Sequence, residues 1–289
     1  MNGVIIGRFM PPHNGHLYLI DFARHIVDTL YILVCTLSHE PIPGDLRFRW
    51  VRELAPSCHA IHITEEIPEA RRGAVGATAI WAKTVREAVP ATITHVFASE
   101  EYGWDLAKEL NARFIPVDPS RRNIPVSATA VRRNPYVHWQ YIPSLVRPYF
   151  VKHLAVVGAT DVAERLADDL KTVVVHSYRA FWEQTWRDAE KNRGNAEREA
   201  VEHESPEMII RSGIRATASA LARHANRILI YDLPGPRALS EIGEVDAVVT
   251  TAENRDDCSA LVPERPILSI SDVSATNIEH LLLTADTVY

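Results

Sequence analysis

The chain alternates short apolar runs with segments in which apolar residues recur every three or four positions. Short apolar runs are typical of strands buried in a parallel sheet, and the longer spacing is typical of helices packed on its faces. In the first half, strands are expected at 4–7, 31–35, 94–99 and 113–117. Helices are expected at 16–30, 47–54 and 77–89, with a helix start at 127–134. The succession of strand, helix and strand predicts βαβ units and a parallel sheet.

The second half restarts the same pattern after a segment with several prolines at 135–150. Strands are expected at 153–159, 172–177, 227–233, 246–251 and 267–271, and helices at 161–170, 206–225 and 275–285. Residues 187–207 are highly charged and are interpreted as a solvated helix or a loop. The predicted fold class is α/β, with a Rossmann-like domain at 1–147 and a second α/β domain at 148–289.

Composition narrows the classes of function. The net charge of −6 gives no sign of a nucleic-acid partner or a membrane surface, although a local basic site for a phosphorylated ligand is compatible with it. Cys35, Cys58 and Cys258 are widely spaced, with no CxxC pair, which argues against disulfides and a zinc site. Without a signal peptide or a membrane-spanning apolar run, we expect a cytoplasmic protein.

The sequence GRFMPPHNGH at 7–16, called the first signature below, packs unusual chemistry between a strand and a helix. Gly7 ends the strand and allows close approach of a ligand. His13 and His16 stand three residues apart at the helix start, with Gly15 leaving room between them, so both rings are expected on one side. A helix N-terminus favours anions, and Arg8 adds positive charge. Together these groups predict a polyphosphate cradle.

Two other interpretations of the histidine pair remain open. The pair could bind a metal ion, but no third ligand is evident nearby. Each ring could instead be structural, with its nitrogens satisfied by the backbone.

The first signature, together with VSATAVR at 126–132 (the second signature), resembles the HxGH nucleotidyltransferase superfamily. The resemblance continues at 46–54, 117–129 and 146–158, towards members that join a nicotinamide-nucleotide adenylyltransferase to a ribosylnicotinamide kinase. It covers residues 1–160 well and the remainder weakly.

The resemblance implies that ATP and nicotinamide mononucleotide are the partners and that NAD and pyrophosphate are the products. The 5′-phosphate of the acceptor would attack the α-phosphate of ATP, with Mg²⁺ bridging the phosphates. By the same resemblance, the catalytic residues are His13, His16 and Arg132. The implied ATP-binding residues are Gly7, Arg8, Phe9, Gly15, Ser127 and Thr129.

The resemblance also suggests acceptor contacts. Trp81 would stack on the nicotinamide ring, although its helical spacing with Val85 fits core packing as well. Arg47 would touch the substrate phosphate, or pack. The sequence assigns no definite role to four polar residues near strand ends, which are Glu100, Tyr102, Asp118 and Arg121; the last two are candidates for nucleotide contact or loop ordering.

The second half departs from the kinase-bearing relatives. Where those carry G-x-x-x-x-G-K-[S/T], this chain has GATDVAER at 158–165, so Ala163, Glu164 and Arg165 replace the second Gly, the Lys and the hydroxyl residue. Glu164 and Asp161 bring negative charge towards the expected phosphate position. We therefore predict a P-loop-kinase-like domain without kinase activity. Asp232 resembles the acidic residue that ends the Walker B strand, or is simply a strand-end aspartate.

Two further functions are compatible with the sequence. One is adenylyl or cytidylyl transfer to another phosphate ester, such as phosphopantetheine. The other is non-catalytic nucleotide sensing. The preference between nicotinamide and nicotinate mononucleotides is left open, as is the oligomeric state, a homo-oligomer included.

Overall fold

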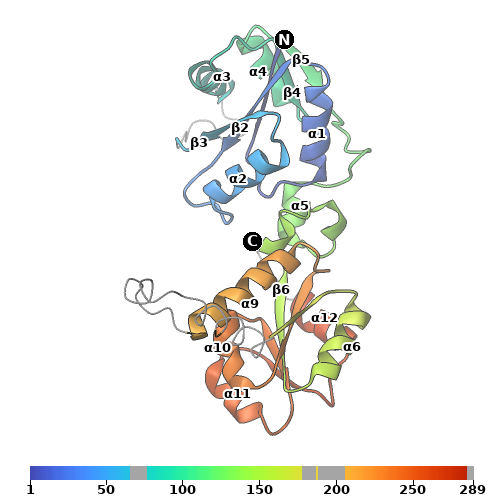
Figure 1. Ribbon diagram of the computed structural model, residues 1–289. Coiled ribbons are helices and arrows are strands. Elements are labelled where there is room, and N and C mark those ends of the chain that lie inside the picture. Colours follow the sequence, from blue (N-terminus) through green and yellow to red (C-terminus); the bar gives the residue numbers. More distant parts are fainter. Residues whose placement is uncertain (66–76, 178–186, 188–205, 285–289) are drawn as a thin grey trace, which may run out of the picture. The chain divides into compact units, whose positions relative to one another are not determined.

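The computed structural model describes residues 1–65, 77–177, 187 and 206–284. They form two compact units, one of Met1–Val146 and one that begins at Arg147 (Figure 1). Each unit contains a five-stranded sheet whose described strand pairs are all parallel. The predicted class of two parallel-sheet α/β units is therefore confirmed.

The first unit has the strand order β3-β2-β1-β4-β5. Its strands are β1 (Asn2–Gly7), β2 (Thr29–Cys35), β3 (His59–Ile63), β4 (His95–Ala98) and β5 (Arg113–Pro116). Its helices are α1 (Asn14–Arg24), α2 (Gly44–Leu54), α3 (Ala77–Ala88), α4 (Tyr102–Glu109) and α5 (Ala128–Arg133), with a short 3-10 turn at Trp139–Tyr141. The chain builds outward from β1 to β3 and then returns beside β1 at β4. At such a reversal, loops at the carboxyl ends of the strands diverge and leave room for a ligand.

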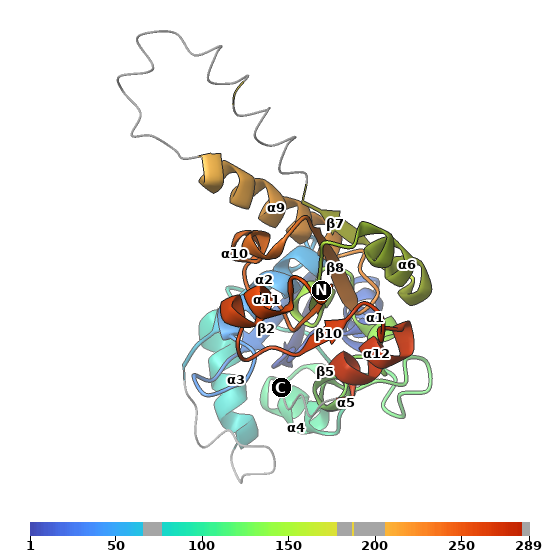
Figure 2. The ribbon, with the colours of Figure 1, turned by 90° about the horizontal axis from the view of Figure 1, so that it is seen from below.

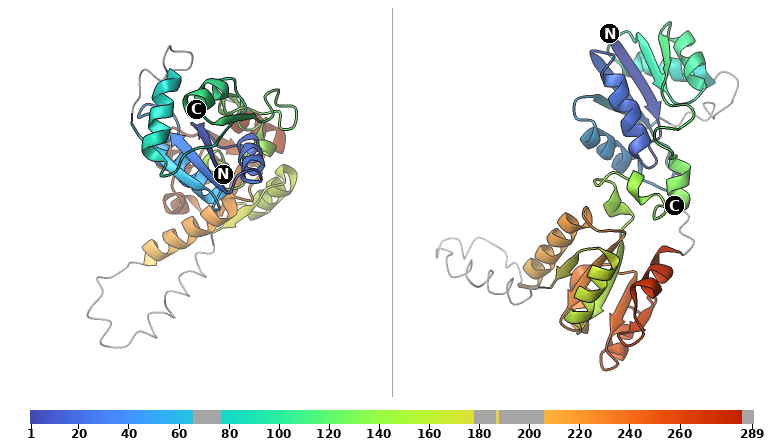
Figure 3. Two further views of the ribbon diagram at one scale, coloured as in Figure 1. Left: turned by 90° about the horizontal axis from the view of Figure 1, so that it is seen from above. Right: turned by 90° about the vertical axis from the view of Figure 1, so that its right-hand side faces the viewer.

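Alternate side chains of the central strands form two hydrophobic clusters. Val4 and Leu33 pack with residues of α3 and α4 on one face, whereas Ile5 and Ile32 pack with residues of α1 and α2 on the other. Side chains of a strand alternate between the faces, so a strand that is buried on both sides must be apolar throughout. The right-hand view of Figure 3 shows α1 running alongside the strands of this unit.

The prediction of a helix over 16–30 is wrong in its extent. Helix α1 ends at Arg24 and β2 already begins at Thr29. Val27 and Leu30 are nevertheless buried in the same cluster as Ile20 and Ala23. Their spacing therefore indicated only that all four residues are buried on the same face of the sheet. Residues in a turn and a strand can be buried there just as residues of a helix can. The structure also adds β3 and α4, which the apolar pattern did not indicate.

The second unit has the strand order β10-β9-β6-β8-β7. Its strands are β6 (Lys152–Val157), β7 (Val174–His176), β8 (Ile228–Leu233), β9 (Ala247–Thr250) and β10 (Ile267–Ser269). Its α-helices are α6 (Thr160–Leu170), α9 (Pro206–Ala222), α10 (Leu239–Ile242), α11 (Arg255–Leu261) and α12 (Ala275–Leu283), and 3-10 turns lie at Arg147–Tyr149 and Pro236–Ala238. Helices α9, α10 and α11 lie on one side of the sheet and α6 and α12 on the other (Figures 1 and 2). Residues 188–205 of the charged segment lie outside the described residues.

The described residues also bear on what composition indicated about membrane spans, cysteines and metal ligands. No helix within these residues is long and apolar enough to cross a membrane. Cys35, Cys58 and Cys258 are free thiols. No group of three His, Cys, Asp or Glu side chains in the described part of the chain is arranged to hold a metal ion.

Candidate functional site

The two histidines of the first signature form the N-terminal cap of α1. His13 is the capping residue, and its Nδ1 accepts a hydrogen bond from the Gly15 N–H at 3.1 Å. The His13 N–H in turn donates to Nδ1 of His16 at 3.3 Å. The imidazole rings stack with their centroids 3.8 Å apart. The fold therefore brings both rings to one side, as the three-residue spacing predicts.

This reciprocal capping fixes the tautomer of both rings. A nitrogen that accepts a backbone N–H carries no proton, so the proton of each neutral imidazole lies on Nε2. Each ring then has an Nε2–H donor that the cap does not use. Two stacked donors of this kind can bind the oxygen atoms of a phosphate.

Both histidines are neutral at neutral pH. Burial lowers the pKa of His13 far below its usual range, and the neighbouring His16 and Arg121 add to the effect. Burial, with a smaller effect from the Arg121 charge, lowers the pKa of His16 to about 3. The pair therefore supplies hydrogen-bond donors, and any positive charge at the site must come from arginines.

The remaining residues of the first signature shape this loop. A Cβ atom on Gly15 would lie 3.0 Å from the His13 ring, so only glycine lets the ring settle over the backbone. Phe9 has a left-handed backbone (φ 48°), and its buried ring lies 4.8 Å from the His16 ring. A residue without glycine's freedom pays about 1–3 kcal/mol for such a conformation, which is typical of functional sites.

The second signature is tied to the first by Arg132. Ser127 caps α5 by accepting the Ala130 N–H at 3.1 Å. Arg132 donates to the carbonyl oxygen of Met10 and to the Thr129 hydroxyl, the latter at 3.3 Å. Residues from the two ends of the first unit's sequence therefore meet in one site, with Arg132 adding a positive charge.

A buried carboxylate that the sequence reasoning missed organises the arginines. The Glu40 side chain is only 4% exposed and pairs with Arg8 at 3.3 Å and with Arg47. Its Oε2 also accepts the Leu37 N–H at 3.0 Å. Glu40 lies in a loop with no motif around it, so its role emerges only when the fold brings Arg8 and Arg47 to it.

The sequence left two roles open for Arg47, substrate contact and packing, and its contacts bear on the second. Its side chain is fully buried, and its guanidinium donates to the carbonyl oxygens of Arg8 at 2.6 Å, Ile42 at 3.0 Å and Cys35 at 3.3 Å. These bonds join the loop after β1 to the loop after β2. The geometry favours the packing alternative, in which Arg47 holds the site together from beneath.

The unassigned strand-end residues have clear partners. The Tyr102 hydroxyl donates to the Ile6 carbonyl oxygen at 2.9 Å and so fixes α4 to β1. The Asp118 carboxylate accepts the N–H groups of Arg122, Asn123 and Ile124, which orders the loop between β5 and α5. Trp81 is partly buried and packs against the cluster that contains Val85, so core packing accounts for part of its ring.

In the second unit, the segment expected to replace a phosphate-binding loop is not a loop. Strand β6 ends at Val157 and α6 begins at Thr160, so only Gly158 and Ala159 connect them. Ala163 is buried on α6, whereas Glu164 is exposed on it. A Walker A motif needs a longer loop, whose backbone N–H groups wrap the phosphates.

Asp232, at the end of β8, is engaged by neighbouring side chains. It accepts the Thr160 hydroxyl at 3.0 Å and pairs with His176 Nδ1 at 3.0 Å. The carboxylate therefore fixes the start of α6 to the end of β7.

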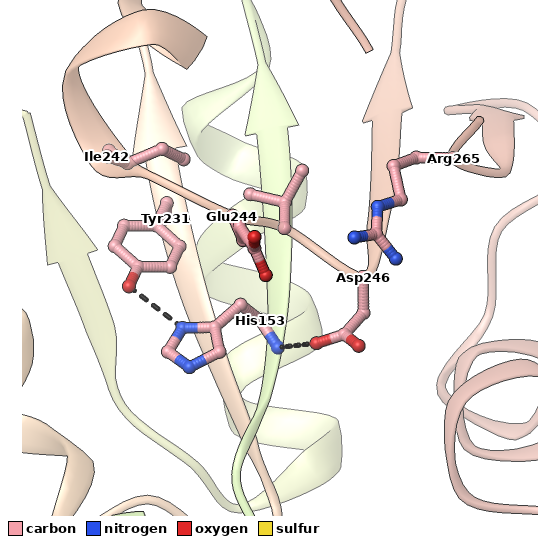
Figure 4. Close-up of a pocket in the computed structure, with 7 residues that line it drawn as sticks. His153, Tyr231, Ile242, Glu244, Asp246 and Arg265 are labelled. Carbon is pink, nitrogen blue, oxygen red and sulfur yellow. Dashed lines mark hydrogen bonds between the residues drawn. The ribbon is translucent and has the colours of Figure 1, made fainter. Parts of the chain in front are cut away.

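A hollow of ≈ 330 Å³ lies elsewhere in the second unit (Figure 4). His153 Nδ1 lies 2.9 Å from the Tyr231 hydroxyl, and Asp246 accepts the His153 N–H at 2.8 Å and the Lys152 ammonium at 3.0 Å. His153 and Asp246 lie at the amino ends of β6 and β9, whereas ligands of open α/β sheets bind at the carboxyl ends. Since these polar groups bond to one another, we interpret the hollow as structural.

Comparison with known proteins agrees with this geometry. Residues 4–134 match the family model described as cytidylyltransferase-like. This match covers most of the first unit, including both signatures.

Part of the chain is similar in sequence to NadR proteins. It is 26% identical over 198 residues to the trifunctional NAD biosynthesis/regulator protein NadR of Salmonella typhimurium (strain LT2), and 27% identical to that of Escherichia coli (strain K12). Each match covers 61% of this chain and 48% of the relative, so the chain spans about half the length of these curated relatives.

Solved NadR structures share the fold. One in complex with NR gives a TM-score of 0.73 at 17% identity, and one in complex with NAD and AMP-PNP gives 0.72 at 18% identity. Both comparisons cover 98% of this chain and 96% of the other. This likeness extends the shared fold through the second unit.

Proposed function

We propose that the first unit is a nicotinamide-nucleotide adenylyltransferase, which transfers AMP from ATP to nicotinamide mononucleotide and releases pyrophosphate. The observation that carries the proposal is the meeting of the His13–His16 pair with Arg132, which is bonded to the Met10 carbonyl oxygen. The relatives named for NAD biosynthesis and the NadR structure with NAD and AMP-PNP support the choice of reaction.

The chemistry follows from the charge that develops during transfer. The acceptor phosphate attacks the α-phosphorus of ATP, the bond to the bridging oxygen breaks, and negative charge moves onto pyrophosphate. The two Nε2–H donors bind phosphate oxygens as this charge grows, and Arg132 and Arg8 stabilise the leaving group. No covalent intermediate with the protein is needed, because positioning and electrostatic stabilisation supply the catalysis.

The divalent cation fits this site as a companion of the nucleotide. Glu40, the buried carboxylate of the site, is engaged by Arg8 and Arg47. Mg²⁺ keeps most of its coordination as water and phosphate oxygens, so it needs few protein ligands. Its contribution would be to neutralise and orient the phosphates of ATP.

The acceptor assignment depends on Trp81. The indole lies on α3, packed on one side against the core and partly exposed. A cationic pyridinium stacked on an indole gains about 1–2 kcal/mol when desolvated. We therefore assign nicotinamide recognition to the exposed part of this ring.

The test is product analysis by chromatography and mass spectrometry. The full chain is incubated with Mg²⁺ and either ATP or CTP, together with nicotinamide mononucleotide, nicotinate mononucleotide or phosphopantetheine. NAD and pyrophosphate from ATP and nicotinamide mononucleotide are expected, and His16→Ala prepared in parallel controls for contaminating enzymes. Turnover of phosphopantetheine alone would move the assignment to that acceptor, and no product from any pair would favour a nucleotide sensor.

We further propose that the second unit does not transfer phosphate from ATP. The two-residue connection between β6 and α6 leaves no loop to wrap a triphosphate, and α6 carries no lysine at its start. The test is phosphorylation of nicotinamide riboside by ATP, with a mock-purified sample as the blank. Nicotinamide mononucleotide formed above that blank would refute this assignment.

A further inference from the structure

The loop between β5 and α5 reaches the same edge of the sheet as the first signature. Strands β4 and β5 pair in parallel from His95↔Arg113 to Ala98↔Pro116, so their following loops leave the sheet together. Strand β4 also pairs with β1, whose loop carries the two histidines. This is the point where the strand order reverses, and ligands of such sheets bind there.

This loop is held in a fixed shape. The Asp118 carboxylate accepts three consecutive backbone N–H groups, at 2.9, 3.1 and 3.2 Å. Asp118 and Arg121 both have left-handed backbones, with φ of 44° and 51°. Asn123 Nδ2 donates to the Tyr18 hydroxyl on α1 at 3.3 Å, which ties the loop to the helix that begins with the histidines. A strained but well-bonded loop is a means of holding one side chain in position.

The side chain so held is Arg121. Its Nη2 lies 3.3 Å from Oε1 of Glu100, the residue that follows β4 by two positions, and the side chain remains 44% exposed. Its positive charge contributes to the lowered pKa of both His13 and His16. Because the histidines are neutral, the counter-charge that the protein itself offers a triphosphate at this site comes from arginines.

We propose that Arg121, which lies outside both signatures, contacts the triphosphate of the bound nucleotide and that Glu100 holds its guanidinium in place before the nucleotide arrives. The proposal rests on the proposed function of the first unit as a nucleotidyltransferase. It adds a third cation to Arg8, which follows β1, and to Arg132, which lies on α5.

The test compares Arg121 with its neighbour Arg122, which is exposed on the same loop. Dissociation constants for Mg-ATP are measured by calorimetry on the full chain, without an acceptor, for wild type, Arg121→Met, Arg121→Lys and Arg122→Met. A second binding event that Arg132→Ala leaves unchanged is assigned to the rest of the chain. Thermal unfolding of each variant checks that the fold is unchanged.

Arg121→Met should weaken Mg-ATP binding by about tenfold to a hundredfold, the cost of a lost charged hydrogen bond. Arg121→Lys should recover part of the loss, and Arg122→Met should change binding by less than about twofold. Equal affinity of Arg121→Met and wild type, or equal losses in the Arg121 and Arg122 variants, would overturn the proposal.

The outcome is separable from that of the proposed function. A wild-type chain that binds Mg-ATP but makes no NAD would refute the acceptor assignment and leave the Arg121 comparison standing. A chain that makes NAD while Arg121→Met binds normally would refute the Arg121 proposal alone. No Mg-ATP binding by the wild type would refute both.

Discussion

Replacing the buried Arg47 by methionine should destabilise the first unit strongly. The substitution removes donors from the carbonyl oxygens of Arg8, Ile42 and Cys35, and it deprives the buried Glu40 of its fully buried partner. Methionine fills much of the volume, so the cavity term is small and the lost polar bonds dominate. Removing one member of a buried ion pair costs about 3–5 kcal/mol. That is a large part of the roughly 5–15 kcal/mol that stabilises a typical domain.

The assay is urea denaturation of the full chain, followed by hydrogen exchange with mass spectrometry. The midpoint of the first unit should fall by about 2 M if unfolding has an ordinary urea dependence. Peptides from β1 and β2 should lose protection, whereas peptides from β6 and β8 provide the internal control. Arg49→Met, exposed on the same helix, should change stability by less than about 0.5 kcal/mol.

A double variant separates the two contributions. Glu40→Gln added to Arg47→Met removes the carboxylate charge that Arg47 had balanced. The double variant should therefore be more stable than the sum of the two single losses predicts. A loss below about 1 kcal/mol in Arg47→Met would refute the account of Arg47 as a buried organiser. A raised KM for the pyridine nucleotide with unchanged stability would instead restore the substrate contact expected from the sequence.

Three further outcomes follow from the site. His16→Ala should lower kcat by about a hundredfold to a thousandfold in a pyrophosphate-release assay, because it removes a donor to the developing charge; unchanged turnover would contradict its catalytic assignment. Trp81→Leu should raise the KM for nicotinamide mononucleotide about five- to thirtyfold and leave that for ATP unchanged, and equal effects on both would indicate packing alone. His16 is neutral when folded down to about pH 3, whereas the unfolded chain protonates it below its ordinary value of 6.5. The stability that the neutral His16 contributes is therefore fully present above about pH 6.5 and is lost as the pH falls from there towards 3. Urea midpoints for His16→Asn should show a slope between pH 4 and 6 that is shallower by about 1.4 kcal/mol per pH unit, and an unchanged slope would show that His16 is charged in the fold.

Those elements were predictable whose formation depends on residues next to one another in the sequence. The runs at 4–7 and 31–35 became central strands because strands buried on both faces must be apolar throughout. Strand β3 was missed because HAIHI mixes histidine with apolar residues, as an edge strand does. Helix α4 was missed because it is short and its second residue is a buried glycine, Gly103, that packs on Phe114.

The same limit applies to the site. The histidine pair was predictable because its geometry is local, with each ring bonded within three residues. The role of Glu40 was not predictable, since its two arginine partners lie on either side of it and meet it only in the folded chain. The sequence could not choose between substrate contact and packing for Arg47, because an arginine on a helix usually faces solvent and its carbonyl partners meet it only in the folded chain.

The two-residue connection after β6 also limits what protein engineering of the second unit can achieve at constant length. Writing Gly, Lys and Ser at 163–165 would place them on α6, where position 163 is buried against the sheet. The first turn of the helix would have to unwind to supply a loop. Unwinding would release Thr160 from Asp232 and draw Val162 and Ala163 out of the core. A phosphate-binding loop can therefore be installed here only by inserting residues between Val157 and Thr160.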